Sequence, residues 1–182
     1  MELVQPIRDK EIIEKVKNIL LKQNVRNYVL FCSGINMGLR ISDILKLKVS
    51  DIKDKTHVEL KEDKTGKTKR FYINDDLRKY FEILIKDMPV NSYIFQSQKG
   101  NNQSIDRIQA YRIINKACRE AGIKESIGTH TLRKTFGYWH YQQFKDVAIL
   151  QNIFNHASQS VTLRYIGIND DIIDNSYKQF SL

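Results

Sequence analysis

Apolar residues recur at helical spacing along most of the chain, and the exception is residues 48–73. Ile12, Val16 and Ile19, for example, lie four and three residues apart, as on the buried face of an amphipathic helix. Asp9 is suited to cap the start of that helix. The same kind of spacing predicts helices over residues 9–23, 25–32, 41–47, 75–86, 105–121, 131–143, 147–154, 160–165 and 170–178.

Residues 48–73 have a shorter apolar period. Their apolar side chains lie two or three residues apart in short runs that polar turns separate. This pattern predicts a small three-stranded antiparallel sheet whose last hairpin turns at residues 64–67. The expected fold class is therefore mixed α+β, mostly helical, with one small sheet.

Length and composition limit the chain to a few classes of protein. A chain of 182 residues with 41% hydrophobic residues is long enough for one domain with a packed core. The two cysteines, Cys32 and Cys118, stand in separate segments, which excludes a zinc ribbon and a disulfide framework. No apolar run approaches the ~18 residues that span a bilayer, and the first residues lack a signal-peptide pattern. We expect a soluble, cytoplasmic protein without membrane contacts.

Positive charge is concentrated in one block of the chain. The formal net charge is +9, and residues 99–134 hold eight basic and three acidic side chains. Within the predicted helix 105–121, Arg112, Lys116 and Arg119 form a basic stripe. A polyanion such as DNA would release counterions on binding such a surface. Charge alone is equally consistent with an ordinary basic protein.

Two short motifs in the first half of the chain could hold a phosphate or move a proton. Arg40 lies in the motif Gly-Leu-Arg where a helix begins, and Asp43 follows one turn later, where it could hold the guanidinium. Lys64 lies at the tip of the predicted hairpin, from which a flexible lysine could reach a ligand. A structural ion pair and a solvated turn lysine are the ordinary interpretations of these two motifs.

Two further motifs lie in the second half. His130 and Arg133 are three residues apart at the start of a helix, so they project from one face beside a helix N-terminus that attracts anions. His156 is followed nine residues later by Tyr165. Separately, each of these residues could be structural. The sequence contains no acidic metal-binding motif, so positive side chains would have to supply the charge.

Taken together, in this order and spacing, the motifs resemble the catalytic domain of the tyrosine recombinase (phage integrase) family over residues 7–165. The matching segments are Gly-Leu-Arg-Ile-Ser-Asp, Lys-Thr-Gly-Lys, His-Thr-Leu-Arg, and Asn-His-Ala-Ser followed by Thr-Leu-Arg-Tyr. The resemblance implies the catalytic-domain fold of that family and an enzyme of a phage or mobile element. Such an enzyme cleaves and rejoins double-stranded DNA through a 3′-phosphotyrosyl intermediate, with no metal and no other cofactor.

The resemblance also implies a role for each of six residues. Tyr165 would attack a DNA phosphate that Arg40 and Arg133 hold, because a guanidinium can bind two oxygens at once. His156 would donate a further hydrogen bond to that phosphate. Lys64 would protonate the leaving 5′-oxygen.

His130, the sixth residue, would assist proton transfer at the tyrosine. Lys64 is chosen among the hairpin lysines because it matches the Lys-x-Gly pattern, with Lys67 as the second choice. Further DNA contacts are expected from five basic residues, which are Lys67, Lys69, Arg112, Lys116 and Arg119.

The chain departs from the family pattern in two places. Phe154-Asn155 stand where many members have Leu-Gly, which affects the backbone of the loop before His156. The usual N-terminal DNA-binding domain is expected to be absent. We expect a single catalytic domain over residues 1–182, with a core of 1–168 and a tail of 169–182 that docks on a neighbouring subunit in a DNA-bound homotetramer.

Three alternative functions are also consistent with this sequence. A type IB topoisomerase would relax DNA with this constellation, and a regulator or remnant could bind DNA without recombining it. A metal-independent ribonuclease could use His130, Lys64 and His156, and it would not need Tyr165.

Overall fold

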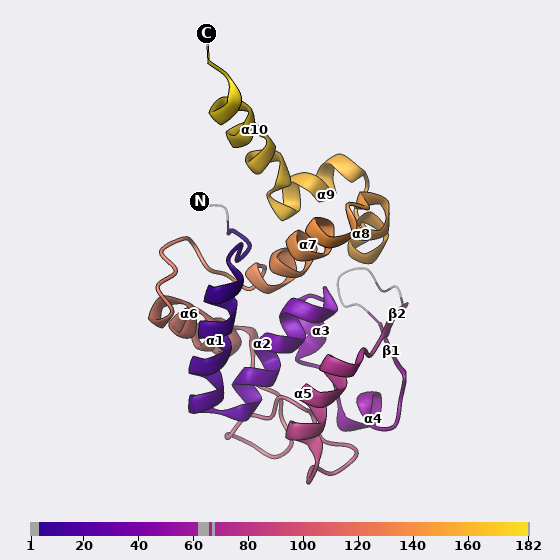
Figure 1. Ribbon diagram of the computed structural model, residues 1–182. Helices are drawn as coiled ribbons and strands as arrows, with labels where there is room; N and C mark the ends of the chain where they lie inside the picture. The colour runs from indigo at the N-terminus through magenta and orange to yellow at the C-terminus, as the bar shows by residue number, and fades with distance from the viewer. Residues whose placement is uncertain (1–3, 62–65, 67, 182) are drawn as a thin grey trace.

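The computed structural model describes residues 4–61, 66 and 68–181, which form ten helices and two strands (Figure 1). The helices are α1 (Lys10–Gln23), α2 (Val25–Met37), α3 (Ile41–Ile44), α4 (Val49–Ile52), α5 (Asp75–Ile85), α6 (Arg107–Glu120), α7 (Thr131–Phe144), α8 (Val147–Phe154), α9 (Gln159–Ile166) and α10 (Ile168–Gln179). The strands are β1 (His57–Lys61) and β2 (Thr68–Tyr72). The expected mostly helical fold with a small sheet is confirmed.

Helix α2 runs through the middle of the fold and packs against α1, α5 and α7 (Figure 1). Every residue from Val29 to Gly34 is buried, as expected for a helix that core residues surround on all sides. The helix continues to Met37, beyond the predicted end at residue 32. Ser33 and Gly34 are weak helix formers, so the local sequence predicted an earlier end. Both are buried in the structure, where tertiary packing overrides this local propensity.

The predicted three-stranded sheet is corrected to two strands among the described residues. Strands β1 and β2 pair antiparallel, from His57 opposite Tyr72 to Lys61 opposite Thr68. The beginning of the region 48–73, which we expected to be sheet, is instead helix α4. Its two apolar residues, Val49 and Ile52, lie three apart, a spacing that one helical turn satisfies as well as a short strand does.

The last helices form a small second core beside the main one. Leu150, Phe154, Ile166 and Ile168 are buried together, apart from the large cluster around α2. Helix α7 joins the two clusters, because Leu132 belongs to the main core while Phe136 packs against the second. The residues of α7 therefore lie between the body of the protein and α8–α9.

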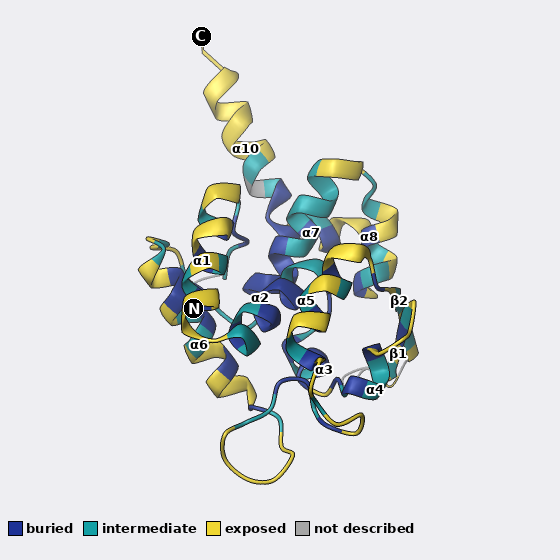
Figure 2. Cartoon of the chain, turned by 60° about the horizontal axis from the view of Figure 1, so that its bottom comes forward, coloured by how far each residue is buried: buried dark blue, intermediate teal, exposed yellow. Residues whose placement is uncertain are grey.

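Helix α10 extends away from the rest of the chain (Figure 1), and most of its surface is exposed (Figure 2). Ile172, Ile173, Tyr177 and Phe180 all present exposed side chains on or just after this helix. No helix in the described part of the chain is both long and apolar enough to cross a membrane.

Candidate active site

The turn between α2 and α3 places Arg40. Gly38 ends α2 with a φ of +64°, and a Cβ at this position would lie only 2.6 Å from the Cε1 atom of Phe136. Glycine therefore satisfies both the left-handed backbone and the close contact. Arg40 immediately precedes α3, and its Nη1 atom is 4.0 Å from Oδ2 of the buried Asp43. The predicted pairing of these two residues is confirmed.

Arg133 links α7 to the end of α8. Its side chain is only 3% exposed, and its Nη2 atom donates a hydrogen bond to the backbone carbonyl of Phe154 at 3.0 Å. The guanidinium carbon also lies 4.6 Å from the centre of the Phe154 ring. These two contacts hold the guanidinium in one orientation at the base of the loop that carries His156.

The loop after α8 tolerates the change from the family's usual glycine. Asn155 has a φ of +54°, a left-handed conformation that asparagine adopts more readily than most residues. His156 follows, and its Nδ1 atom lies 3.1 Å from the hydroxyl of the buried Thr162 on α9. The His156 ring lies against both Phe154 and Tyr165, with ring centres 5.3 and 5.0 Å apart.

Three basic side chains act electrostatically on the His156 ring. Burial, and then the positive charges of Arg133, Arg40 and Lys69, lower the pKa of His156 to about 4. The imidazole is therefore neutral at pH 7 when nothing is bound. The part of this effect that comes from the three positive charges also favours binding of an anion beside the ring.

Tyr165 lies on α9 with its hydroxyl in the same positive region. The hydroxyl oxygen is 3.2 Å from Nδ1 of His130, the residue immediately before α7. Burial raises the pKa of Tyr165, whereas Arg133 and Arg40 act to lower it. The Nζ atom of Lys134 also lies 5.2 Å from the centre of the tyrosine ring. Burial outweighs the arginines, so the pKa of Tyr165 stays raised and its hydroxyl needs a base to become a nucleophile at pH 7.

The structure brings together five of the six predicted catalytic residues: Arg40, His130, Arg133, His156 and Tyr165. The sixth, Lys64, and the second choice, Lys67, lie outside the described residues. Within the described chain, no group of three or more His, Cys, Asp or Glu side chains could hold a metal ion.

Lys69 belongs to this site, although its sequence pattern suggested only a general DNA contact. Its side chain is half-buried, whereas its strand neighbours Thr68 and Arg70 are exposed. Its amine donates a hydrogen bond to the carbonyl of Ile153, close to the His156 loop. The alternation of side chains in β2 could have indicated this inward direction. The contact between Lys69 and Ile153 joins residues 84 positions apart, which a local pattern cannot predict.

The basic stripe of α6 lies elsewhere. Lys116 pairs with Glu120 of the same helix at 3.9 Å, and Arg119 donates to the carbonyl of Ile123 at 2.8 Å. Figures 1 and 2 both show α6 beside α1, away from the β1–β2 hairpin. Arg112 is exposed on the same helix. These three residues therefore do not line the cluster around Tyr165.

Comparisons with known proteins agree with this geometry. The phage integrase family model matches residues 7–171. The probable integrase/recombinase YoeC of Bacillus subtilis is 50% identical over 99% of this chain and 98% of its own length. The tyrosine recombinase XerA of Pyrococcus furiosus is 27% identical over 86% of this chain, which spans 55% of that protein.

Solved structures show the same fold. A crystal structure of XerA recombinase superposes with a TM-score of 0.77 at 22% identity, over 98% of this chain and 64% of that one. A lambda integrase dimer bound to a COC′ core site gives a TM-score of 0.72 over 91% of this chain and 49% of that one. The chain therefore belongs to the phage integrase family of tyrosine recombinases, which cleave and rejoin DNA.

Proposed function

We propose that this protein is a site-specific recombinase or integrase that cleaves and rejoins double-stranded DNA through a covalent link to Tyr165. The observation that carries the proposal is that the Tyr165 hydroxyl lies 3.2 Å from Nδ1 of His130 while its ring centre is 5.0 Å from that of His156. The positive charges of Arg40 and Arg133 act on both Tyr165 and His156. One phosphate placed among these groups would meet two guanidinium ions and a nucleophile. A solved XerH recombinase, 22% identical, is described as a post-cleavage complex with its difH substrate, which supports DNA as the partner.

The proposed reaction exchanges one phosphate ester for another. The Tyr165 oxygen attacks the phosphorus, a phosphotyrosyl bond forms at the 3′ end, and the bond to the 5′-oxygen breaks. His130, 3.2 Å from the tyrosine hydroxyl, accepts its proton. The reverse attack by a 5′-hydroxyl releases Tyr165. Because the ester bond is conserved, rejoining needs no nucleotide cofactor.

The arginines and His156 would stabilise the transition state. Its negative charge is spread over the phosphate oxygens, so catalysis depends on positioning and on positive charge. Arg133 is already oriented by Phe154, and Arg40 by Asp43. A bound phosphate would offset the positive charges that lower the pKa of His156, which favours the donor form of this ring.

Covalent capture tests the proposal. A nicked duplex with a candidate element end loses a short fragment after cleavage, so rejoining cannot remove the intermediate. In EDTA, at high protein concentration and low salt, wild-type protein is expected to form a denaturant-stable band, with the DNA mapped to Tyr165 by mass spectrometry. A requirement for a divalent metal, or attachment to another residue across a panel of element ends, would contradict it.

The roles of the hairpin lysines can be distinguished by changing the leaving atom of the DNA substrate. We propose Lys64 as the general acid, so Lys64→Ala is expected to lose cleavage of ordinary DNA. It should regain most of its activity when sulfur replaces the leaving 5′-oxygen, since a thiolate leaves without protonation. Lys69→Ala is expected to be slow on both substrates, because Lys69 holds the carbonyl of Ile153.

Single-turnover cleavage rates on the matched oxygen and sulfur substrates measure these effects. Lys67→Ala serves as the control variant and should cleave both. Recovery with sulfur in Lys69→Ala or Lys67→Ala, but not in Lys64→Ala, would move the general acid to that residue.

We also propose that residues 1–168 form the catalytic core and that residues 169–182 dock on a neighbouring subunit in a DNA-bound tetramer. Ile172, Ile173 and Phe180 leave 57%, 53% and 69% of their surface exposed, which is unusual for three apolar side chains so close in sequence. The chain is similar to a lambda integrase that is described as a DNA-bound dimer.

Removal of residues 172–182 is therefore expected to weaken assembly on DNA without preventing binding by a single subunit. This truncation keeps Asp171 and its contact with Arg8. Light scattering of the complexes measures their mass. A truncated protein that forms the same assembly as the full chain would show that the tail packs on its own subunit.

A further inference from the structure

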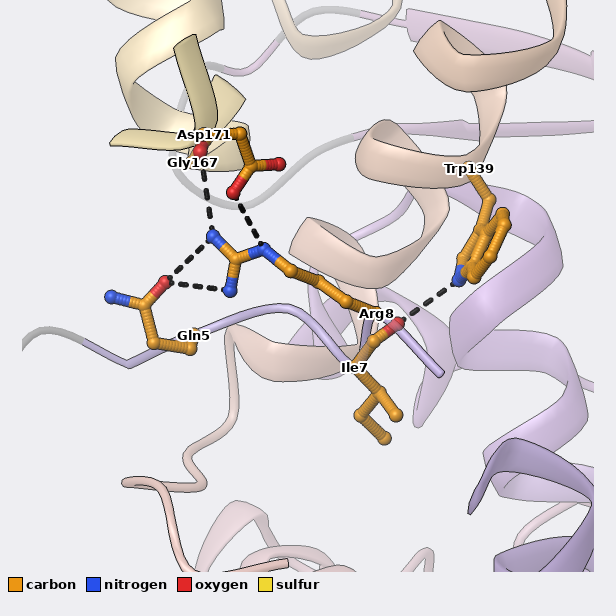
Figure 3. Close-up of polar contacts among 6 residues, drawn as sticks. All are labelled: Gln5, Ile7, Arg8, Trp139, Gly167 and Asp171. Atoms are coloured by element: carbon orange, nitrogen blue, oxygen red, sulfur yellow. Dashed lines mark hydrogen bonds and ion pairs between the residues drawn. The ribbon is translucent and has the colours of Figure 1, made fainter. Parts of the chain in front are cut away.

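Residues 5–8 connect the N-terminal segment to α7. The backbone amide of Ile7 donates to the hydroxyl of Thr135 at 2.9 Å, and the indole of Trp139 donates to the carbonyl of Ile7 at 3.0 Å. Figure 3 shows the Trp139 contact beside the side chain of Arg8. Both polar groups of the Ile7 backbone are thus held by side chains one turn apart on α7, the helix that carries Arg133.

The side chain of Arg8, the residue after Ile7, extends to the C-terminal end of α9. Its Nη2 atom donates to the carbonyl of Gly167 at 3.3 Å, and its Nε atom lies 3.2 Å from Oδ1 of Asp171 (Figure 3). Nη1 and Nη2 both lie 3.3 Å from the side-chain oxygen of Gln5. The guanidinium carbon is 5.4 Å from the ring centre of Tyr138 on α7. One side chain therefore contacts α7, the end of α9 and the start of α10.

The turn at Gly167 leaves space for this contact. Gly167 ends α9 with a φ of +79°, and a Cβ there would lie 2.6 Å from Nη2 of Arg8. Tyr165 is only two residues before this turn, and Ile166 and Ile168 are buried on either side of it. The apolar contacts hold the turn in the small core, but they have little directional preference. The hydrogen bond from Arg8 adds a fixed direction.

We propose that Arg8 is a positioning residue for DNA cleavage, which holds the end of α9 against α7 so that Tyr165 stays aligned with His130 and Arg133. This inference rests on the proposed role of Tyr165 as the nucleophile. Displacing a reacting atom by about 1 Å can lower a rate by ~100-fold. A contact at the helix end that carries the nucleophile therefore acts on the reaction without touching DNA.

The hydrogen bond to Gly167, rather than the ion pair with Asp171, carries the effect. The side chains of Arg8 and Asp171 are 32% and 29% exposed, so solvent and salt weaken their attraction. Asp171→Asn removes the ion pair and leaves the Gly167 contact in place. Arg8→Lys keeps the charge, but one ammonium group cannot reproduce the forked contacts to Gln5 and Gly167.

Fluorine NMR of the DNA-free protein reports on the position of Tyr165 independently of activity. With 3-fluorotyrosine at position 165, wild-type protein is expected to give one resonance. Arg8→Ala should shift or split it, Arg8→Lys should do so less, and Asp171→Asn should leave it unchanged. Arg26→Ala is the matched control, because Arg26 also donates to a backbone carbonyl, that of Gln96 at 2.6 Å, in a different part of the fold.

Single-turnover cleavage at saturating DNA gives the second measurement. Arg8→Ala is expected to be about tenfold slower than wild type or worse, with a DNA dissociation constant within about twofold. Arg26→Ala should cleave at the wild-type rate even where its melting temperature falls. A wild-type resonance or a wild-type cleavage rate in folded Arg8→Ala overturns the proposal. Should Arg8→Ala fail to fold, the same two criteria apply to Arg8→Lys.

The two proposals fail in different ways. Absence of a Tyr165 adduct in the wild-type protein would overturn the proposed nucleophile. The fluorine resonance would still decide whether Arg8 holds Tyr165 in place. A normal wild-type adduct combined with an unchanged Arg8→Ala would overturn the role of Arg8 alone.

Discussion

Tyr165→Phe is expected to bind DNA as tightly as the wild-type protein and to form no covalent adduct. The substitution keeps the ring, and with it the contacts to Phe154 and His156, whose ring centres lie 5.5 and 5.0 Å away. It removes only the oxygen that faces His130 at 3.2 Å. Binding depends on many phosphate contacts, whereas attack depends on this one atom.

Denaturing gels and a binding titration on the same nicked duplex measure the two quantities. Tyr177→Phe is the matched control, since Tyr177 lies on α10 with 78% of its surface exposed. It is expected to form the adduct at the wild-type rate. An adduct that persists in Tyr165→Phe, or one that disappears in Tyr177→Phe, would contradict the assignment of Tyr165 as the nucleophile.

Arg133→Ala is expected to slow cleavage by about 100- to 1,000-fold, the usual effect of removing one preorganised donor from a charged transition state. DNA affinity should fall only modestly, because other basic residues also contact phosphates. The variant should also be less stable by about 2 kcal/mol, since the buried hydrogen bond to the Phe154 carbonyl is lost.

Arg40→Ala separates catalysis from stability. Arg40 is more exposed than Arg133, with 20% of its side chain accessible, so its loss should affect cleavage similarly but folding less. Single-turnover rates and urea unfolding measure both effects. Arg133→Lys is expected to remain slow, because an ammonium group cannot replace the two-sided guanidinium contact. Cleavage at the wild-type rate in Arg40→Ala or Arg133→Ala would disprove the proposal that these two arginines hold the reacting phosphate.

Local patterns in the sequence were sufficient for most helices, and the motifs selected residues that the structure brings together. Asp9 caps α1 as predicted, and its carboxylate accepts from the amides of Glu11 and Ile12. The nine-residue step from His156 to Tyr165 was also informative. A loop and two turns of α9 separate His156 from Tyr165, and this spacing brings their rings together.

Contacts between distant segments could not be predicted in this way. Val49 and Ile52 fit a helix and a strand equally well, and only packing decided between them. Arg8 carries no motif, and its contact with Gly167 joins residues 159 positions apart. Nothing in the local sequence marks Lys69 among the hairpin lysines, because its inward direction depends on the sheet register and on the contact with Ile153.

The second core has a consequence for how this enzyme tolerates change. In the described part of the chain, this core has four buried apolar side chains, Leu150, Phe154, Ile166 and Ile168, with partly buried hydrophobic residues around them. Stabilisation scales with buried apolar area, so we expect this unit to open locally at a lower free energy than the helices around α2. Cleavage competence should then follow this local opening equilibrium. A substitution near Ile166 can silence the enzyme while leaving its global melting temperature unchanged.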